Sequence, residues 1–123
     1  MEVPVITAEP QGPLAVEEGD SLSLNWTYNL NGNNLLTIFA KVLDTGEVSI
    51  VERVISNPAS IEPDFTGRIT GNITDSFASV TFLAVNGSTD SGNYLFRIRN
   101  FEDASVPARV TITVLGKCTE SFC

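Results

Sequence analysis

The chain has 123 residues, with 15 acidic and 7 basic side chains, no histidine and a net charge of −8. This length suffices for one domain whose core needs no metal, and 42% apolar with 18% charged residues is typical of a globular protein. The acidic balance excludes a nucleic-acid-binding domain, and the lack of histidine excludes imidazole acid–base chemistry and histidine-ligated zinc.

Short segments with a period of two residues, separated by turn residues, run along the whole chain and predict β-strands. Pro10, Gly12 and Pro13 are expected to split the first strand in two, and residues 44–46 read as a hairpin turn. The predicted strands are residues 3–7, 14–16, 21–28, 35–43, 48–55, 68–70, 77–85, 93–101 and 106–115. Eight or nine short strands without a convincing helix indicate an all-β antiparallel sandwich or barrel.

Two segments resemble strands of immunoglobulin domains. Residues 90–96 read Asp-Ser-Gly-Asn-Tyr-Leu-Phe and resemble the D-x-G-x-Y-x-C signature of strand F, while residues 22–26 resemble the L-x-L-x-C of strand B. Arg68 precedes Asp90 by 22 residues, which is similar to the Arg–Asp pair that closes one end of a variable-type (V-set) domain. The resemblance covers residues 3–115. It implies a two-sheet V-set-like sandwich of 8–9 strands, with one domain at 1–116 and a tail or linker at 117–123.

The sequence departs from the immunoglobulin pattern at both cysteines of the disulfide between strands B and F. Trp26 and Phe96 occupy those positions, and Phe39 is the best match to the missing tryptophan of strand C. A disulfide closing so long a loop would contribute roughly 4 kcal/mol. Burying one large aromatic side chain contributes on the order of 5 kcal/mol. We therefore expect an aromatic cluster to replace the bridge.

Three further residues at these motifs have structural interpretations. Tyr94 is expected to be a tyrosine-corner residue whose hydroxyl bonds to nearby backbone. Arg68 and Asp90 are expected to form a structural ion pair. None of the three supports catalysis.

The only cysteines, Cys118 and Cys123, lie in the last six residues. Their C-x4-C spacing fits neither a zinc nor a redox motif. They are disulfide candidates, either with each other or with a downstream segment. No apolar run reaches the roughly eighteen residues of a membrane span, and no leader precedes the fold, so we expect a mature fragment with an added start Met.

The sequence offers no catalytic residues, metal site or cofactor site. Without histidine, no nucleophile–base pair can be assembled unless a lysine or carboxylate serves as base. Paired carboxylates lie in predicted loops, where solvated charge is the ordinary explanation, and residues 17–20 lack the acidic spacing of an EF-hand loop. An enzyme or metal-dependent domain is thus the minor hypothesis.

Three N-x-[ST] sequons begin at Asn25, Asn72 and Asn86. Together with the resemblance to immunoglobulin domains, these sequons favour a secreted or cell-surface location. If Trp26 points inward, Asn25 points out from the sheet of strands A, B, E and D, and the other two sequons fall near the same sheet. A bulky glycan disfavours an interface there. The sheet of strands G, F, C and C′ carries no sequon.

Strand C is apolar on both faces, and four of the seven basic residues fall on strands C, C′ and F. An apolar stripe edged by charges of both signs is self-complementary about a two-fold axis. Alternatively, a long loop covers strand C. The predicted homophilic face comprises Leu36, Ile38, Lys41, Asp44, Glu47, Glu52, Arg53, Leu95, Arg97, Arg99 and Phe101.

Within the superfamily, residues 18–28 and 83–94 are most similar to the membrane-distal domains of hydroid (cnidarian) allorecognition receptors. That resemblance implies an extracellular module of a single-pass membrane protein that binds another copy of itself on an opposing cell, in an allele-specific way, with no nucleic-acid or small-molecule partner. The alternative is a heterophilic receptor or secreted binder that uses the Asn-rich loop 29–34 and its neighbours at one end of the sandwich.

Overall fold

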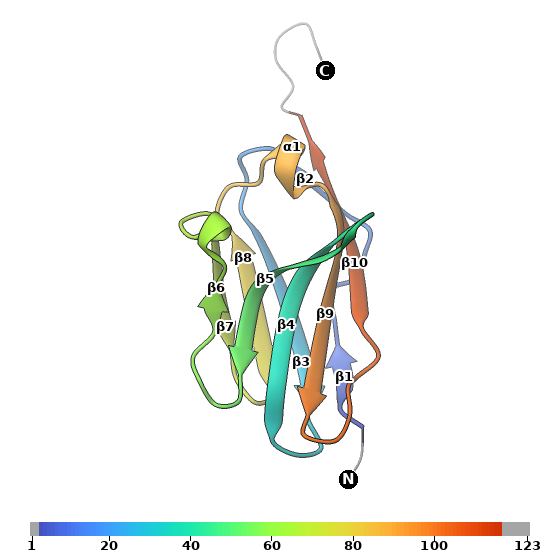
Figure 1. Cartoon of the computed structure of the whole chain (residues 1–123). Helices are drawn as coiled ribbons and strands as arrows, with labels where there is room; N and C mark the ends of the chain where they lie inside the picture. The colour runs from blue at the N-terminus through green and yellow to red at the C-terminus, as the bar shows by residue number, and fades with distance from the viewer. Residues whose placement is uncertain (1–2, 117–123) are drawn as a thin grey trace, which may run out of the picture.

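Two β-sheets packed face to face make up the computed structural model, which describes residues 3–116 (Figure 1). One sheet has the order β1 (Val5–Ala8), β3 (Leu22–Asn29), β8 (Phe77–Phe82) and β7 (Ile69–Ile73). The other has the order β2 (Leu14–Glu17), β10 (Ala108–Leu115), β9 (Gly92–Asn100), β4 (Asn34–Leu43), β5 (Gly46–Val54) and β6 (Ser60–Ile61). Every pairing is antiparallel except that of β2 with β10. The prediction of an all-β two-sheet sandwich is confirmed.

The structure adds three short elements that the sequence did not predict. β6 has two residues and pairs with β5, a 3₁₀ turn covers Pro63–Phe65, and a single helical turn, α1, covers Gly87–Asp90. Each is too short to produce a periodic pattern. The split of the first strand occurs as expected. β1 and β2 belong to different sheets, and the chain crosses between them through a cis Gly12–Pro13 bond.

Alternation of side chains along β3 shows why the sheets pack as they do. Leu24, Trp26 and Tyr28 are buried between the sheets, whereas the intervening polar residues are exposed. Successive side chains of a strand point to opposite faces, so the apolar set must lie on one side. The same pattern in β8 and β10 completes the core.

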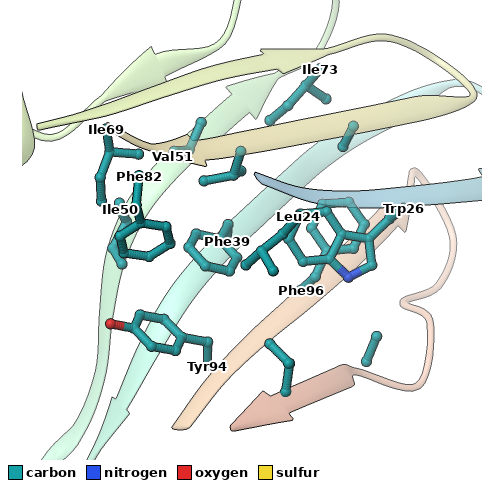
Figure 2. Close-up of a cluster of buried hydrophobic side chains, with 14 of the residues drawn as sticks. Leu24, Trp26, Phe39, Ile50, Val51, Ile69, Ile73, Phe82, Tyr94 and Phe96 are labelled. Atoms are coloured by element: carbon teal, nitrogen blue, oxygen red, sulfur yellow. The ribbon is translucent and has the colours of Figure 1, made fainter. Parts of the chain in front are cut away.

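An aromatic cluster ties the two sheets together at the positions where the cysteines were expected. The rings of Trp26 on β3 and Phe96 on β9 stack with centroids 4.5 Å apart and planes 10° apart. Phe39 lies between this pair and Tyr94, with ring centroids 5.4 Å from both Trp26 and Tyr94, and Phe82 meets it edge-on (Figure 2). These rings are almost fully excluded from solvent, so the cluster fills the volume of the missing bridge.

The two tyrosines fasten opposite ends of the sandwich. The Tyr94 hydroxyl donates to the backbone oxygen of Asp90 at 2.6 Å, where β9 begins. The Tyr28 hydroxyl donates to the backbone oxygen of Thr74 at 2.5 Å, in the turn between β7 and β8. Burial of each phenol raises its pKa well above the ordinary value.

An ion pair closes the end of the sandwich next to α1. The Arg68 guanidinium donates to one carboxylate oxygen of Asp90 at 2.7 Å, and the other oxygen accepts the backbone N–H of Asn86 at 2.7 Å. Asp90 is buried and Arg68 is partly exposed. A buried carboxylate with both oxygens bonded is a structural group, which is the role that the sequence predicts for it.

Replacement of Phe96 by alanine should lower the free energy of unfolding by about 3–5 kcal/mol, because it removes a ring from the stack and leaves a cavity. Urea denaturation followed by fluorescence of Trp26, the only tryptophan, measures the change. Phe77→Ala is the matched control. Phe77 is partly exposed on the outer face of β8, and its loss should cost about 1 kcal/mol or less. Equal losses for the two variants would contradict the assignment.

Alkaline pH should unfold the domain before its tyrosines ionise freely. Because the folded pKa of both phenols lies above the unfolded value near 10, their contribution to stability is complete below pH 10 and is lost as the pH rises further. Phenolate absorbance should therefore rise together with the loss of the circular dichroism signal. In urea, both phenols should titrate near pH 10. Ionisation at pH 10 with the fold intact would overturn the prediction.

Candidate functional site

Charged residues are divided unequally between the two sheets. The four strands of the β1-β3-β8-β7 sheet contain none. The strands of the other sheet carry eight: Glu17, Lys41, Glu47, Glu52, Arg53, Arg97, Arg99 and Arg109. The two outer surfaces therefore have different chemistry, and we call them the uncharged face and the charged face.

The uncharged face presents hydroxyl and amide groups. Thr7 bonds Thr27 at 3.0 Å and Ser23 bonds Thr81 at 2.9 Å across neighbouring strands. The sequon residues Asn25 and Asn72 are both exposed on it. Both pair with the same residue, Ser79 of β8, so they lie in one row about 10 Å apart. Asn86, the third sequon residue, is exposed in the segment between β8 and α1.

The charged face is organised about β4, which runs between β9 and β5 (Figure 1). Outward positions of β4 are apolar: Leu36, Ile38, Ala40 and Val42. Arginines from β9 and β10 lie along one flank, and glutamates from β5 lie along the other. From β10 to β5 the two signs are thus separated, with an apolar stripe between them, while Glu17 lies on β2, beyond β10.

An ion pair spans the apolar stripe. The Arg97 guanidinium on β9 lies 3.4 Å from the Glu47 carboxylate on β5, so the pair must cross over β4. Ala40 and Leu95 are 0% and 1% exposed, and Ile38 is 8% exposed. The prediction that Leu95 and Ile38 form an open binding surface is therefore wrong in the free domain, because long neighbouring side chains cover them. Leu36 and Val42 remain half-buried.

Lys41 and Arg53 do not belong to the charged face, contrary to the prediction. Lys41 has the same parity on β4 as Phe39, so its ammonium turns to the side between the sheets, over the Tyr94 ring and 2.6 Å from the backbone oxygen of Thr89. Arg53 likewise faces the inter-sheet side, where it bonds Asp75 at 2.7 Å and its side chain is 11% exposed. Lys41 thus fastens α1 to the sandwich, and Arg53 fastens the turn that holds Asp75.

The other predicted contact residues lie at several places. Arg99 and Glu52 are outward residues of β9 and β5 without an oppositely charged partner among residues 3–116. Asp44 is exposed in the turn between β4 and β5. Phe101 follows β9 and is 56% exposed, beyond the sheet rather than on its outer face.

Segments 30–33, 55–59 and 101–107 form one end of the sandwich, which we call the loop end. Phe101 and Ile55 border a shallow hollow of about 260 Å³ there, with Asn34 and Asp75. Ile55 has a φ of 56°, a left-handed conformation that is an outlier for a β-branched residue. Asn34 holds it by donating to the Ile55 backbone oxygen at 2.7 Å. The sequence reading did not identify Ile55, since a strained φ leaves no pattern in the sequence.

Residues 3–116 contain no cluster of three or more potential metal ligands, and every buried side-chain polar atom in that range has a hydrogen-bond partner. No helix in the described part of the chain has the length and apolar character to span a membrane. Cys118 and Cys123 lie outside the described residues.

Many solved structures have a similar fold, and the following three all have low sequence identity to this chain. The N-terminal Ig1-2 module of the Drosophila receptor protein tyrosine phosphatase DLAR has a TM-score of 0.68 and 19% identity, over 94% of this chain and 50% of that one. A tandem of titin Ig domains has a TM-score of 0.64 and 17% identity, over 94% and 51%. Murine CRIg has a TM-score of 0.71 and 15% identity, over 93% and 99%. The chain spans about half the length of the first two.

The sequence itself matches no protein family. It has no significant similarity to a curated protein. The structural likeness is nevertheless consistent across nearly the whole chain, and it agrees with the sheet order described above. The domain therefore has an immunoglobulin-like fold.

Proposed function

We propose that the domain is an extracellular recognition module that binds a second copy of itself through the charged face. The observation that carries this proposal is the separation of sign across that face, with arginines on one flank of β4 and glutamates on the other. A surface with that arrangement is complementary to its own copy, and complementary charge confers specificity on an interface. Such binding needs no catalytic group and no cofactor.

Two features of the fold support this choice of face. A variable-type domain extends its strand-G–F–C sheet with two more strands, and we assign β5 and β6 to that role, which enlarges the charged face. On the opposite surface, glycans at Asn25 and Asn72 would occupy one row and hinder contact. We propose that the protein is a cell-surface glycoprotein.

The dimensions of the charged face suit weak binding. Four strands about 4.8 Å apart and four rows about 6.6 Å apart cover on the order of 500 Å² per partner, less than the roughly 800 Å² of a stable interface. Many copies on one surface would supply the strength that a single contact lacks. Allele-specific recognition, the finer function that we propose, then requires only a substitution that leaves one charge of the face opposite a like charge.

Charge reversal on one flank should abolish self-association, and mixing complementary variants should restore it. Sedimentation of Arg97→Glu/Arg99→Glu and of Glu47→Arg/Glu52→Arg should show monomers, because each variant sets like charges against each other. A 1:1 mixture should associate as the wild type does. The mixture also controls for net charge. A wild type that is monomeric up to millimolar concentration, or variants that associate unchanged, would contradict the proposal.

A second candidate function has one observation in its favour. The loop end exposes Ile55 and Phe101, at 47% and 56%, beside the hollow described above, and residue strain of the kind seen at Ile55 gathers at binding sites. A heterophilic binder would use this end. The test uses beads coated with the domain and cells that do not express it. Binding of the beads to the cells, loss of that binding in the Ile55→Ser/Phe101→Ser variant, and no binding of the domain to itself would together select this function.

Glycosylation provides an independent test of the proposed location. When the chain is expressed through a secretory pathway, enzymatic removal of N-glycans should lower its mass. Asn25→Gln and Asn72→Gln should each remove one glycan, because both side chains are exposed. Asn33→Gln is the control, since Asn33 is exposed but lies outside a sequon. The glycosylated domain should still self-associate. An unmodified chain would count against the cell-surface proposal.

A further inference from the structure

We infer that the two copies pair with their strands parallel, about a two-fold axis that runs along β4. This inference rests on the proposed self-association and specifies its geometry. In such a pair, β9 of one copy faces β5 of the other, and the loop ends of both copies lie together. The end of β10, at Leu115, then lies beside α1 at the opposite end of the pair in both copies (Figure 1).

The strand register turns the charged face into a grid. Its columns are β9, β4 and β5, and each row is a set of directly paired residues that point outward. The outward positions alternate along β9 and β4, so successive rows are two residues apart on these strands, and on β5 a bulge at Ile50 sets Glu52 and Ser49 three residues apart. From the loop end upward the rows are Arg99–Leu36–Val54, Arg97–Ile38–Glu52, Leu95–Ala40–Ser49 and Asn93–Val42–Glu47.

The direction of the two-fold axis decides which columns meet. An axis along the strands exchanges the two flanking columns and keeps each row in place, so the arginine column of one copy faces the glutamate column of the other. An axis across the strands keeps the columns and reverses the rows, so the arginine column of one copy lies over the arginine column of the other, with Arg99 opposite Asn93 and Arg97 opposite Leu95. Columns of like sign that lie over each other repel, whereas the axis along the strands sets Arg97 of one copy against Glu52 of the other. The charge pattern therefore favours the axis along the strands.

Unpaired charges on the two flanks add to this preference. Arg99 and Glu52 have no oppositely charged partner among residues 3–116, and they lie in adjacent rows on opposite flanks. In the parallel pair, Arg99 of one copy lies one row away from Glu52 of the other copy, and the reverse contact is equivalent by symmetry. Arg97 and Glu47 are held to each other only by a partly exposed 3.4 Å contact. A surface pair of this kind contributes little, so it can exchange for contacts between copies.

The parallel pair differs from the contact expected between opposing cells. In the parallel pair the β10 ends of both copies lie at the same end, which fits two molecules side by side on one surface. Molecules on facing surfaces would instead meet with their strands reversed. The pair would present two loop ends together. Any ligand of the loop end would then meet two copies of Ile55 and Phe101 at once, which raises its effective affinity.

The geometry is tested by cross-linking through β4, the column on the axis. In a Cys118→Ser/Cys123→Ser background, Leu36→Cys and Val42→Cys each place one thiol on the stripe. Stacked sheets lie about 10 Å apart, while residues 36 and 42 are about 20 Å apart along the strand. A bis-maleimide that reaches about 10 Å therefore links only residues that face each other directly. Circular dichroism and Trp26 fluorescence verify that each variant is folded.

The parallel pair predicts that Leu36→Cys links to itself, that Val42→Cys links to itself, and that a 1:1 mixture forms little of the mixed product. Mixed product without self-linked product would overturn the parallel geometry and leave self-association standing. The parallel geometry would also be overturned if the Cys118→Ser/Cys123→Ser protein sediments as a dimer while neither single-cysteine variant is cross-linked. A background protein that stays monomeric at millimolar concentration would instead overturn the proposed function.

Discussion

The stack of Trp26 on Phe96 is the interaction on which the rest of the molecule depends. It joins β3 and β9, an inner strand from each sheet, and its ring centroids are 4.5 Å apart. A disulfide at this place would act mainly by restricting the unfolded chain. The stack acts in the folded state, through buried area and ring–ring attraction. Because the stack fixes which alternate side chains of β3 and β9 point into the core, it also fixes which of their residues face outward.

Outward parity gives the two sheets their different surfaces. On β3, the positions between the buried rings carry Ser23, Asn25 and Thr27, which place a sequon and hydroxyl groups in water. On β9, Leu95, Arg97 and Arg99 each follow one of the buried residues Tyr94, Phe96 and Ile98. A one-residue slip of either strand would exchange core for surface, so the chemistry of the charged face is tied to the packing of the core.

Much of this arrangement could be predicted from the chain alone. Strict alternation at 21–28 identified the buried face of β3, and the 22-residue spacing identified the pairing of Arg68 with Asp90, which is present at 2.7 Å. Lys41 was misplaced although it lies two residues from Phe39, and strand parity puts both on the core side. The covering of Ala40 could not be predicted, because only the fold brings Arg97 and Glu47 together across β4.

The aromatic stack also determines the environments in which the domain can persist. The chain holds only two cysteines, both after residue 116, so nothing between β3 and β9 can be cut by thiols. Folding of the sandwich therefore needs no oxidant and no disulfide isomerase, and its stability should be the same in a reducing cytosol as outside the cell. A domain built in this way can be produced in any redox compartment with the proposed recognition surface intact.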